Sequence, residues 1–255
     1  MDLGVIQGRL SPPVDGHIQE FPYENWEREF NLLEQVGLSH IEWVITKESF
    51  DYILNWDVAR HNRRISSICC DNLIIKTLTD KKVLSQQLRP ICEWALNNWV
   101  DNITIPLLED SALTMETLPD LIELFGSYGK VFPELNFNFE VDSNVGLAMW
   151  LVNESPNFYL VYDTGNITSA NLSHTEWISK AHDKIRNVHL KDRTIDPVQT
   201  VPPSMGDTPF KLIFEELKKV GYTGRYTIQT ARGVSGREVT TIKEHAAYFK
   251  NLYNE

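Results

Sequence analysis

The sequence predicts an α/β fold made of a single (β/α)8 TIM barrel over residues 1–255. Eight short β-rich runs alternate with eight segments whose apolar residues recur at helical spacing. Such alternation is typical of parallel sheets covered by helices, and the length of 255 residues suits one barrel. An open, doubly wound sheet is the alternative, but no GxGxxG motif follows the first strand.

Each strand is predicted from a run of β-branched and aromatic residues that ends at polar or turn-forming residues. The strands cover residues 3–7, 40–44, 65–70, 102–107, 135–141, 158–162, 187–190 and 226–229. The helices cover residues 23–36, 56–62, 79–98, 114–128, 144–152, 174–182, 209–220 and 238–252. We expect Gly37 to end the first helix, Thr79 or Asp80 to cap the third, and Pro90 to kink or restart that helix.

The composition narrows the class of partner. Lys and Arg total 24 and Asp and Glu total 35, so the net charge is −11. This balance argues against nucleic acid and against anionic membranes, and leaves a small-molecule partner. The N-terminal stretch lacks the basic and apolar regions of a signal peptide. Three cysteines are too few for a disulfide framework, so we expect a cytoplasmic protein.

Polar residues stand where the last four predicted strands end. They are Glu140, Asp163, His189 and Gln229. Function in a (β/α)8 barrel lies at the carboxyl ends of the strands, where these side chains would converge. Two carboxylates, an imidazole and an amide oxygen suit Mn²⁺, Mg²⁺, Co²⁺ or Zn²⁺. The simpler alternative is that they only satisfy loops and helix N-termini.

Four stretches resemble the xylose-isomerase-like barrel superfamily. They are GVIQGRLSP (4–12), NFNFEVD (136–142), VYDTGN (161–166) and NVHLKDR (187–193), of which DTGN followed 26 residues later by HLKD is the most specific. By strand order the resemblance covers the whole chain. It implies an activity among the sugar and sugar-phosphate isomerases and epimerases or the inosose dehydratases. The apurinic endonuclease branch fits poorly, since its additional strand-end histidines are missing.

The resemblance implies a metal held by Glu, Asp, His and Glu from strands five to eight, as in the ketose epimerases. Glu140, Asp163 and His189 match by position, but Gln229 stands where the family has its fourth ligand, a glutamate. In the family, two glutamates on opposite faces of the substrate exchange protons at carbon. A glutamine can bind a metal through its carbonyl oxygen, but it cannot accept a proton at neutral pH.

Three interpretations of Gln229 remain open. Glu140 could be the sole base of an isomerase or one-base variant. Alternatively, Glu42 on strand two or another carboxylate could supply a second base, although Glu42 could equally be a loop or helix-cap acceptor. In the third interpretation, the barrel binds sugars without turnover.

Basic residues at strand ends point to an anionic carbohydrate, such as a sugar phosphate or sugar acid. They are Arg9, Lys191, Arg193 and Arg232. Arginine binds phosphate and carboxylate through two parallel hydrogen bonds, and Lys191 could also polarise a carbonyl. Asn166 stands where epimerase relatives often carry His and would contact a substrate hydroxyl. The alternative is that these cations form ordinary salt bridges in the loops.

We therefore expect a divalent-metal-dependent sugar or sugar-phosphate isomerase/epimerase that transfers a proton next to a carbonyl. The expected catalytic residues are Glu140 and Lys191, and the expected substrate contacts are Arg9, Glu42, Asn166, Arg193 and Arg232. A dehydratase of the inosose or dehydroshikimate kind on the same barrel is the first alternative. A non-catalytic sugar-binding barrel is the second. The resemblance also allows a homodimer.

Overall fold

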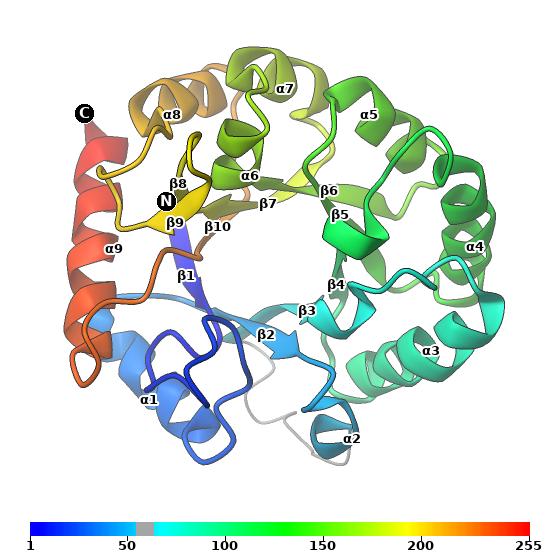
Figure 1. Cartoon of the computed structure of the whole chain (residues 1–255), viewed down its shortest axis with the longest axis horizontal. Coiled ribbons are helices and arrows are strands. Elements are labelled where there is room, and N and C mark those ends of the chain that lie inside the picture. The colour runs from blue at the N-terminus through cyan, green and yellow to red at the C-terminus, as the bar shows by residue number, and fades with distance from the viewer. Residues whose placement is uncertain (55–63) are drawn as a thin grey trace.

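Eight parallel strands close into a barrel surrounded by helices in the computed structural model, which describes residues 1–54 and 64–255 (Figure 1). The strand order is β1-β10-β7-β6-β5-β4-β3-β2. The strands are β1 (Asp2–Ile6), β2 (Ile41–Ile45), β3 (Ile65–Cys70), β4 (Asn102–Leu107), β5 (Asn136–Val141), β6 (Phe158–Asp163), β7 (Ile185–Leu190) and β10 (Arg225–Ile228). This closure confirms the predicted (β/α)8 barrel and excludes the open sheet.

The helices surround the strands, except the short helix α6, which lies inside the ring of outer helices (Figure 1). They are α1 (Trp26–Val36), α2 (Phe50–Ile53), α3 (Lys81–Asn97), α4 (Leu118–Val131), α5 (Val145–Asn153), α6 (Thr164–Ser169), α7 (His174–Ala181), α8 (Phe210–Lys219) and α9 (Glu238–Asn254). Each helix in the described ranges is too short or too polar to cross a lipid bilayer. The helix expected at residues 56–62 lies outside the described residues.

The residues expected to end and to cap helices do so, whereas Pro90 does not interrupt its helix. Gly37 ends α1 in the left-handed conformation at φ 69°, which glycine adopts without steric cost. The Asp80 carboxylate accepts a hydrogen bond from the Lys82 amide and caps α3. Pro90 lies inside α3, but the helix does not restart there. Of the kink or restart expected at Pro90, the restart is therefore wrong and the kink stays a prediction.

Several short elements near the carboxyl ends of the strands were not predicted. The segment expected to be a loop after residue 190 contains an antiparallel pair, β8 (Asp192–Thr194) and β9 (Gln199–Val201). Helix α6 begins directly after β6, because the Asp163 carboxylate accepts a hydrogen bond from the Asn166 amide. Short 3-10 helices follow β3 at Asp71–Leu73 and β4 at Glu109–Ser111.

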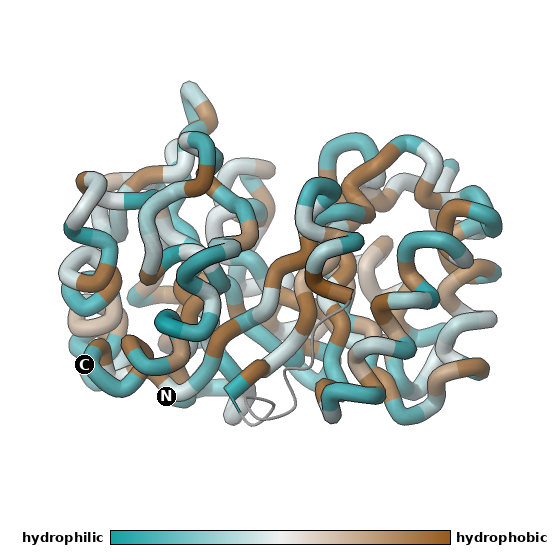
Figure 2. Tube along the Cα trace, turned by 90° about the horizontal axis from the view of Figure 1, so that it is seen from below, coloured by the Kyte–Doolittle hydropathy of each residue, from teal (hydrophilic) through white to brown (hydrophobic). Residues whose placement is uncertain are grey.

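Apolar packing lies mainly between the strands and the outer helices. Figure 2 shows apolar residues along the strands, and alternating apolar and polar residues along the surrounding helices. Inside the barrel, Ile6, Val44 and Cys69 form a small separate apolar cluster. The layer beneath it is polar and includes Glu42 and Asn187, both buried. Hydrogen-bonded polar groups therefore fill part of the barrel below the carboxyl ends of its strands.

Candidate metal and active site

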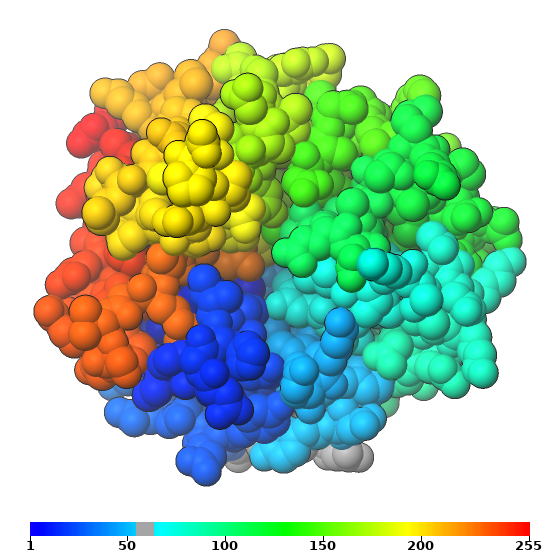
Figure 3. All heavy atoms as spheres, viewed as in Figure 1, coloured from blue at the N-terminus to red at the C-terminus, as the bar shows by residue number. Residues whose placement is uncertain are grey.

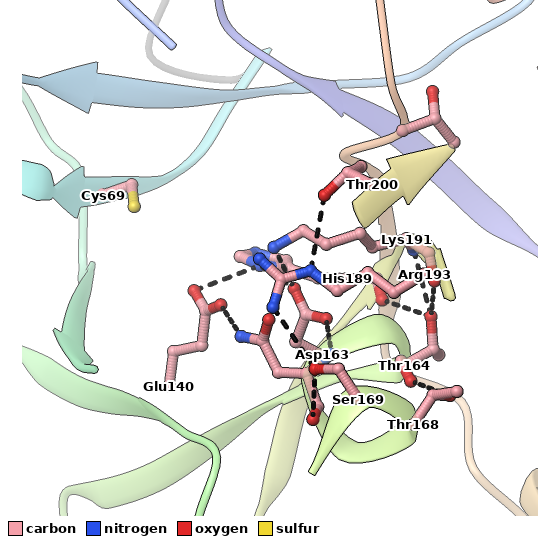
Figure 4. A network of polar contacts seen from close by, with 12 residues as sticks. Cys69, Glu140, Asp163, Thr164, Thr168, Ser169, His189, Lys191, Arg193 and Thr200 are labelled. Carbon is pink, nitrogen blue, oxygen red and sulfur yellow. Dashed lines mark hydrogen bonds and ion pairs between the residues drawn. The ribbon is translucent and has the colours of Figure 1, made fainter. Parts of the chain in front are cut away.

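Three side chains from neighbouring strands meet near the carboxyl end of the barrel. Glu140 lies on β5, Asp163 ends β6 and His189 lies on β7. One ligand atom of each lies within 4.8 Å of the other two, and all three residues are buried (Figure 4). The structure thus brings together three of the four predicted metal ligands.

Hydrogen bonds from the first turn of α6 orient the two carboxylates. The Asn166 amide nitrogen donates to Asp163 Oδ1 at 2.7 Å, and the Asn166 side chain donates to Glu140 Oε1 at 2.8 Å. The other carboxylate oxygens then lie near His189 Nδ1, at 3.3 Å for Glu140 Oε2 and 3.9 Å for Asp163 Oδ2. Asn166 therefore contacts the ligand group from one side.

Glu42 lies on the opposite side of His189. Its Oε2 is 2.6 Å from His189 Nε2 and 3.3 Å from the Asn187 side-chain nitrogen, while its Oε1 accepts hydrogen bonds from Ser67 and Thr104. The carboxylate has no exposed surface. An ionised carboxylate only accepts hydrogen bonds, so His189 donates through Nε2 and presents Nδ1 to the ligand group.

Mutual interactions shift the protonation of this group. Burial alone would raise the pKa of Glu42 and of Glu140, but His189 lowers each to about 2. Burial alone would lower the pKa of His189, yet the two carboxylates raise it well above its usual value. Without a metal, His189 is therefore an imidazolium between two carboxylates.

The donor set fits a divalent cation. His189 Nδ1 and Gln229 Oε1 are buried and have no hydrogen-bond partner within residues 1–54 and 64–255. Gln229 follows β10, and its backbone amide donates to Leu190 at the end of β7. Carboxylate, imidazole and amide oxygen donors together match Mn²⁺, Zn²⁺ or Co²⁺. A cation would satisfy Nδ1 once its proton has left.

The ammonium group of Lys191 lies beside the same donors. Its Nζ is 2.7 Å from Asp163 Oδ2. The side chain crosses the first turn of α6 at Gly165, where an added Cβ would lie 2.9 Å from Lys191 Cγ and 3.1 Å from Arg193 Cγ. Glycine is thus required for this close approach, and it leaves Lys191 next to the ligand group.

The three predicted arginines contact the surrounding loops. Arg193 donates to Thr200 on β9 and to Ser169 on α6, each at 3.3 Å (Figure 4). Arg9 and Arg232 both donate to the backbone oxygen of Ile18. They therefore hold the first loop against the barrel mouth, where it lies beside the β8–β9 segment (Figure 3). Contact of these arginines with a substrate remains a prediction.

A further carboxylate, Asp71, stands at the end of the third predicted strand, outside the set of site residues predicted above. It lies near the site, because Glu140, Lys191 and Glu42 all shift its pKa electrostatically. Its position after a buried strand was the available signal. Its strand lies outside the four stretches that carry the family resemblance, so the resemblance implies no role for it.

Comparisons with solved structures identify the fold. The IOLI protein with a bound zinc atom has a TM-score of 0.78 and 14% identity, and the alignment covers 99% of each chain. L-ribulose 3-epimerase has a TM-score of 0.73 and 13% identity over 99% of this chain and 94% of that one. A probable 3-DHS dehydratase, AsbF from Bacillus anthracis, has a TM-score of 0.70 and 13% identity over 98% and 99%.

The sequence comparison points the same way. Residues 144–252 match the family model of the xylose isomerase-like TIM barrel, and this range contains Asp163, His189 and Gln229. A search of curated protein sequences finds no significant match. The suspected resemblance is thereby confirmed: the chain folds as a xylose isomerase-like TIM barrel, and its second half carries the sequence pattern of that family.

Proposed function

We propose that this protein is a divalent-metal-dependent isomerase or epimerase of small carbohydrates. The observation that carries the proposal is the buried group of Glu140, Asp163 and His189 at the carboxyl end of the barrel. Enzymes on this fold place their chemistry at that end. The zinc-bound structure and the epimerase structure named above have the same fold, which supports the class of reaction.

Glu140, Asp163 and His189 would hold the metal, with Gln229 Oε1 as a fourth donor. When bound, the ion would supply a Lewis acid that polarises the substrate carbonyl and makes the neighbouring C–H more acidic. Glu140 is ionised at neutral pH, because the pKa of its carboxyl is about 2. Its carboxylate would take the proton from that carbon, while the Asn166 side chain holds its other oxygen.

Cations beside the site would bind an anionic substrate. Lys191 would hydrogen-bond the oxygen that gains charge as the proton leaves, since its Nζ lies beside Asp163. Arg193 is part-buried between α6 and β9, where its guanidinium would bind a phosphate or carboxylate group. Arg9 and Arg232 would contribute if the first loop moves, since both hold that loop now.

A dehydratase is the second candidate. The Lys191 ammonium beside Asp163 favours it, because loss of water needs an acid near the departing hydroxyl as well as the base Glu140. The fold similarity to a probable 3-DHS dehydratase is compatible with this reaction. The two reactions differ in product mass, so mass spectrometry separates them.

Hydrogen exchange tests the proposal directly. The protein would be incubated in D₂O with Mn²⁺ or Zn²⁺ and a panel of ketopentoses, ketohexoses, their phosphates and inosose-type ketones. We expect deuterium at the carbon next to the carbonyl, with at least a hundredfold loss in Glu140→Gln. The control, Glu123→Gln, alters an exposed glutamate on α4 and should exchange normally.

Two outcomes would overturn the proposal. The first is exchange at the same rate in the wild type and Glu140→Gln. The second is sugar-dependent thermal stabilisation that a chelator does not change, with no exchange across the panel. That second result would favour a binding barrel without turnover.

A further inference from the structure

Exchange of a proton between the two faces of a carbon needs a second acid or base opposite Glu140. This inference rests on the proposed function above. Gln229 cannot accept a proton at neutral pH. Glu42 has no exposed surface, and both its oxygens already accept hydrogen bonds from residues inside the barrel. Neither Gln229 nor Glu42 can therefore be the second group.

The register of the sheet places the end of β3 near the level of Glu140. Cys69 pairs with Thr104 on β4, and Thr104 pairs with Asn138 on β5. Two residues further along β4 and β5, Pro106 pairs directly with Glu140. Asp71 stands two residues after Cys69, one residue past the end of β3, where it begins the short 3-10 helix. The end of β3, which Asp71 follows, is thus two strands from Glu140 on β5, or about 10 Å at a strand spacing of 4.8 Å.

The side chain of Asp71 belongs to the interior of the barrel. Cys69 lies in the apolar cluster inside the barrel with Ile6 and Val44. The Cys69 thiol donates to Asp71 Oδ1 at 3.2 Å, which fixes the carboxylate above Cys69. Figure 4 shows Cys69 across the ligand group from Arg193 and Thr200.

The surroundings of Asp71 suit proton transfer. Burial and the Glu140 carboxylate raise the pKa of Asp71 to about 6, although the Cys69 hydrogen bond and Lys191 oppose this. The Arg9 guanidinium lies within electrostatic range of Asp71 as well. Burial raises the pKa of Cys69 well above its usual value, so the thiol stays protonated as a donor. Asp71 is only partly buried, which allows its proton to exchange with solvent.

We propose that Asp71 is the second catalytic proton-transfer residue and makes this barrel a two-base epimerase of ketone sugars. Glu140 takes the proton from the carbon next to the carbonyl, and the electrons of that C–H bond form the enediolate of the substrate. The Asp71 carboxylic acid then gives its proton to the other face of the same carbon, and the carbonyl reforms. Glu140 ends protonated and Asp71 ionised, and exchange with water resets both.

Single-base variants distinguish this mechanism from a one-base reaction. In D₂O, Asp71→Asn should wash deuterium into one epimer of the active ketone at the wild-type rate, while epimerisation falls at least a hundredfold. Glu140→Gln should show the opposite selectivity, with slow exchange into the other epimer only. Asp101→Asn is the matched control, because Asp101 lies before β4 at the opposite end of the barrel.

Metal binding provides a readout that does not depend on turnover. Asp71 is not among the grouped ligands, so Asp71→Asn should bind Mn²⁺ with wild-type affinity in a chelator competition, whereas Glu140→Gln should bind it more weakly. If Asp71→Asn does not fold, Asp71→Glu should keep the metal affinity and restore part of the epimerisation.

The inference is overturned if Asp71→Asn epimerises as fast as the wild type, or if it loses exchange into both epimers while it still binds Mn²⁺. If the wild type exchanges hydrogen with no member of the panel, the proposed function fails and this inference fails with it. A wild type that exchanges without needing Asp71 contradicts the inference alone and leaves the proposed function standing.

Discussion

At the scale of single residues, Glu42 holds the His189 ring through a hydrogen bond and raises its pKa, but does not face the mouth of the barrel. The carboxylate lies 2.6 Å from His189 Nε2 and also accepts hydrogen bonds from Ser67 and Thr104. A carboxylate in this position fixes the ring and raises the basicity of the nitrogen that binds the metal. Glu42 is thus a positioning residue in the proposed site, rather than the substrate contact expected from the sequence.

Replacing Glu42 by Gln should weaken Mn²⁺ or Zn²⁺ binding by about 10- to 100-fold. The amide keeps the size of the side chain but removes the charge that holds the imidazole. A chelator competition measures the affinity, and Glu123→Gln on the surface of α4 is the matched control. Equal affinities for all three proteins would show that Glu42 does not act through His189.

Gln229 provides the converse test. Its Oε1 is buried and has no hydrogen-bond partner among the residues described. If Gln229 is the fourth metal ligand, Gln229→Glu adds a negative charge to the ligand set, and a bound cation offsets the repulsion among the carboxylates. We expect at least tenfold tighter metal binding and a lower Tm in the presence of a chelator, both followed in one thermal titration. Tighter binding would fail to appear if Gln229 lies outside the metal shell.

At the scale of elements, α6 and α7 are joined by a buried histidine. His174 begins α7 and contacts the hydroxyl groups of Tyr162 on β6 and Thr168 on α6. Burial lowers the pKa of His174 from 6.5 to about 4. The histidine is therefore neutral in the folded protein at pH values where the unfolded chain binds a proton.

This shift predicts a loss of stability in acid. The contribution of a neutral His174 is fully present above pH 6.5 and is lost as the pH falls toward 4, by about 3 kcal/mol in total. In His174→Gln, the free energy of unfolding should change less over this interval, as urea titrations at several pH values would measure. Exposed His182 offers the control His182→Gln. Parallel pH curves for the wild type and His174→Gln would contradict the assignment.

The sequence predicted most elements because their signals are local. Runs of β-branched and aromatic residues located all eight strands of the barrel, and the strand ends identified Glu140, Asp163 and His189. Helix α6 and the β8–β9 pair were not predicted. Helix α6 depends on the cap from Asp163, a residue that the prediction used only as a ligand. The β8–β9 pair is only three residues long in each strand, too short for a periodic signal.

The roles of Glu42 and Asp71 could not be deduced from local patterns. The stagger of the strands around the closed barrel decides whether Glu42 faces the barrel mouth or lies behind His189. The hydrogen bonds that the Glu42 carboxylate accepts come from partners as distant in sequence as Asn187. Asp71 lies just past the end of β3, and the register of β3, β4 and β5 places that end near the level of Glu140. Strand ends predict which residues converge, whereas register decides which of them face one another.

At the scale of the whole molecule, metal binding should be coupled to the stability of the entire barrel. The ligands come from β5, β6 and β7, so the site exists only when the sheet is closed, and an ion that binds only the folded state stabilises it. An ion at 100 times its Kd adds about 2.7 kcal/mol to the free energy of unfolding, which corresponds to a rise in Tm of about 5–10 °C for a chain of this size.

Calorimetry with Mn²⁺ or Zn²⁺ followed by excess chelator measures this shift. The doubly substituted Asp163→Asn, His189→Asn protein should show none, while Asp101→Asn should respond as the wild type. A metal-dependent shift that survives loss of both ligands would place the ion elsewhere, and the absence of a shift in the wild type would remove the metal from the proposed reaction.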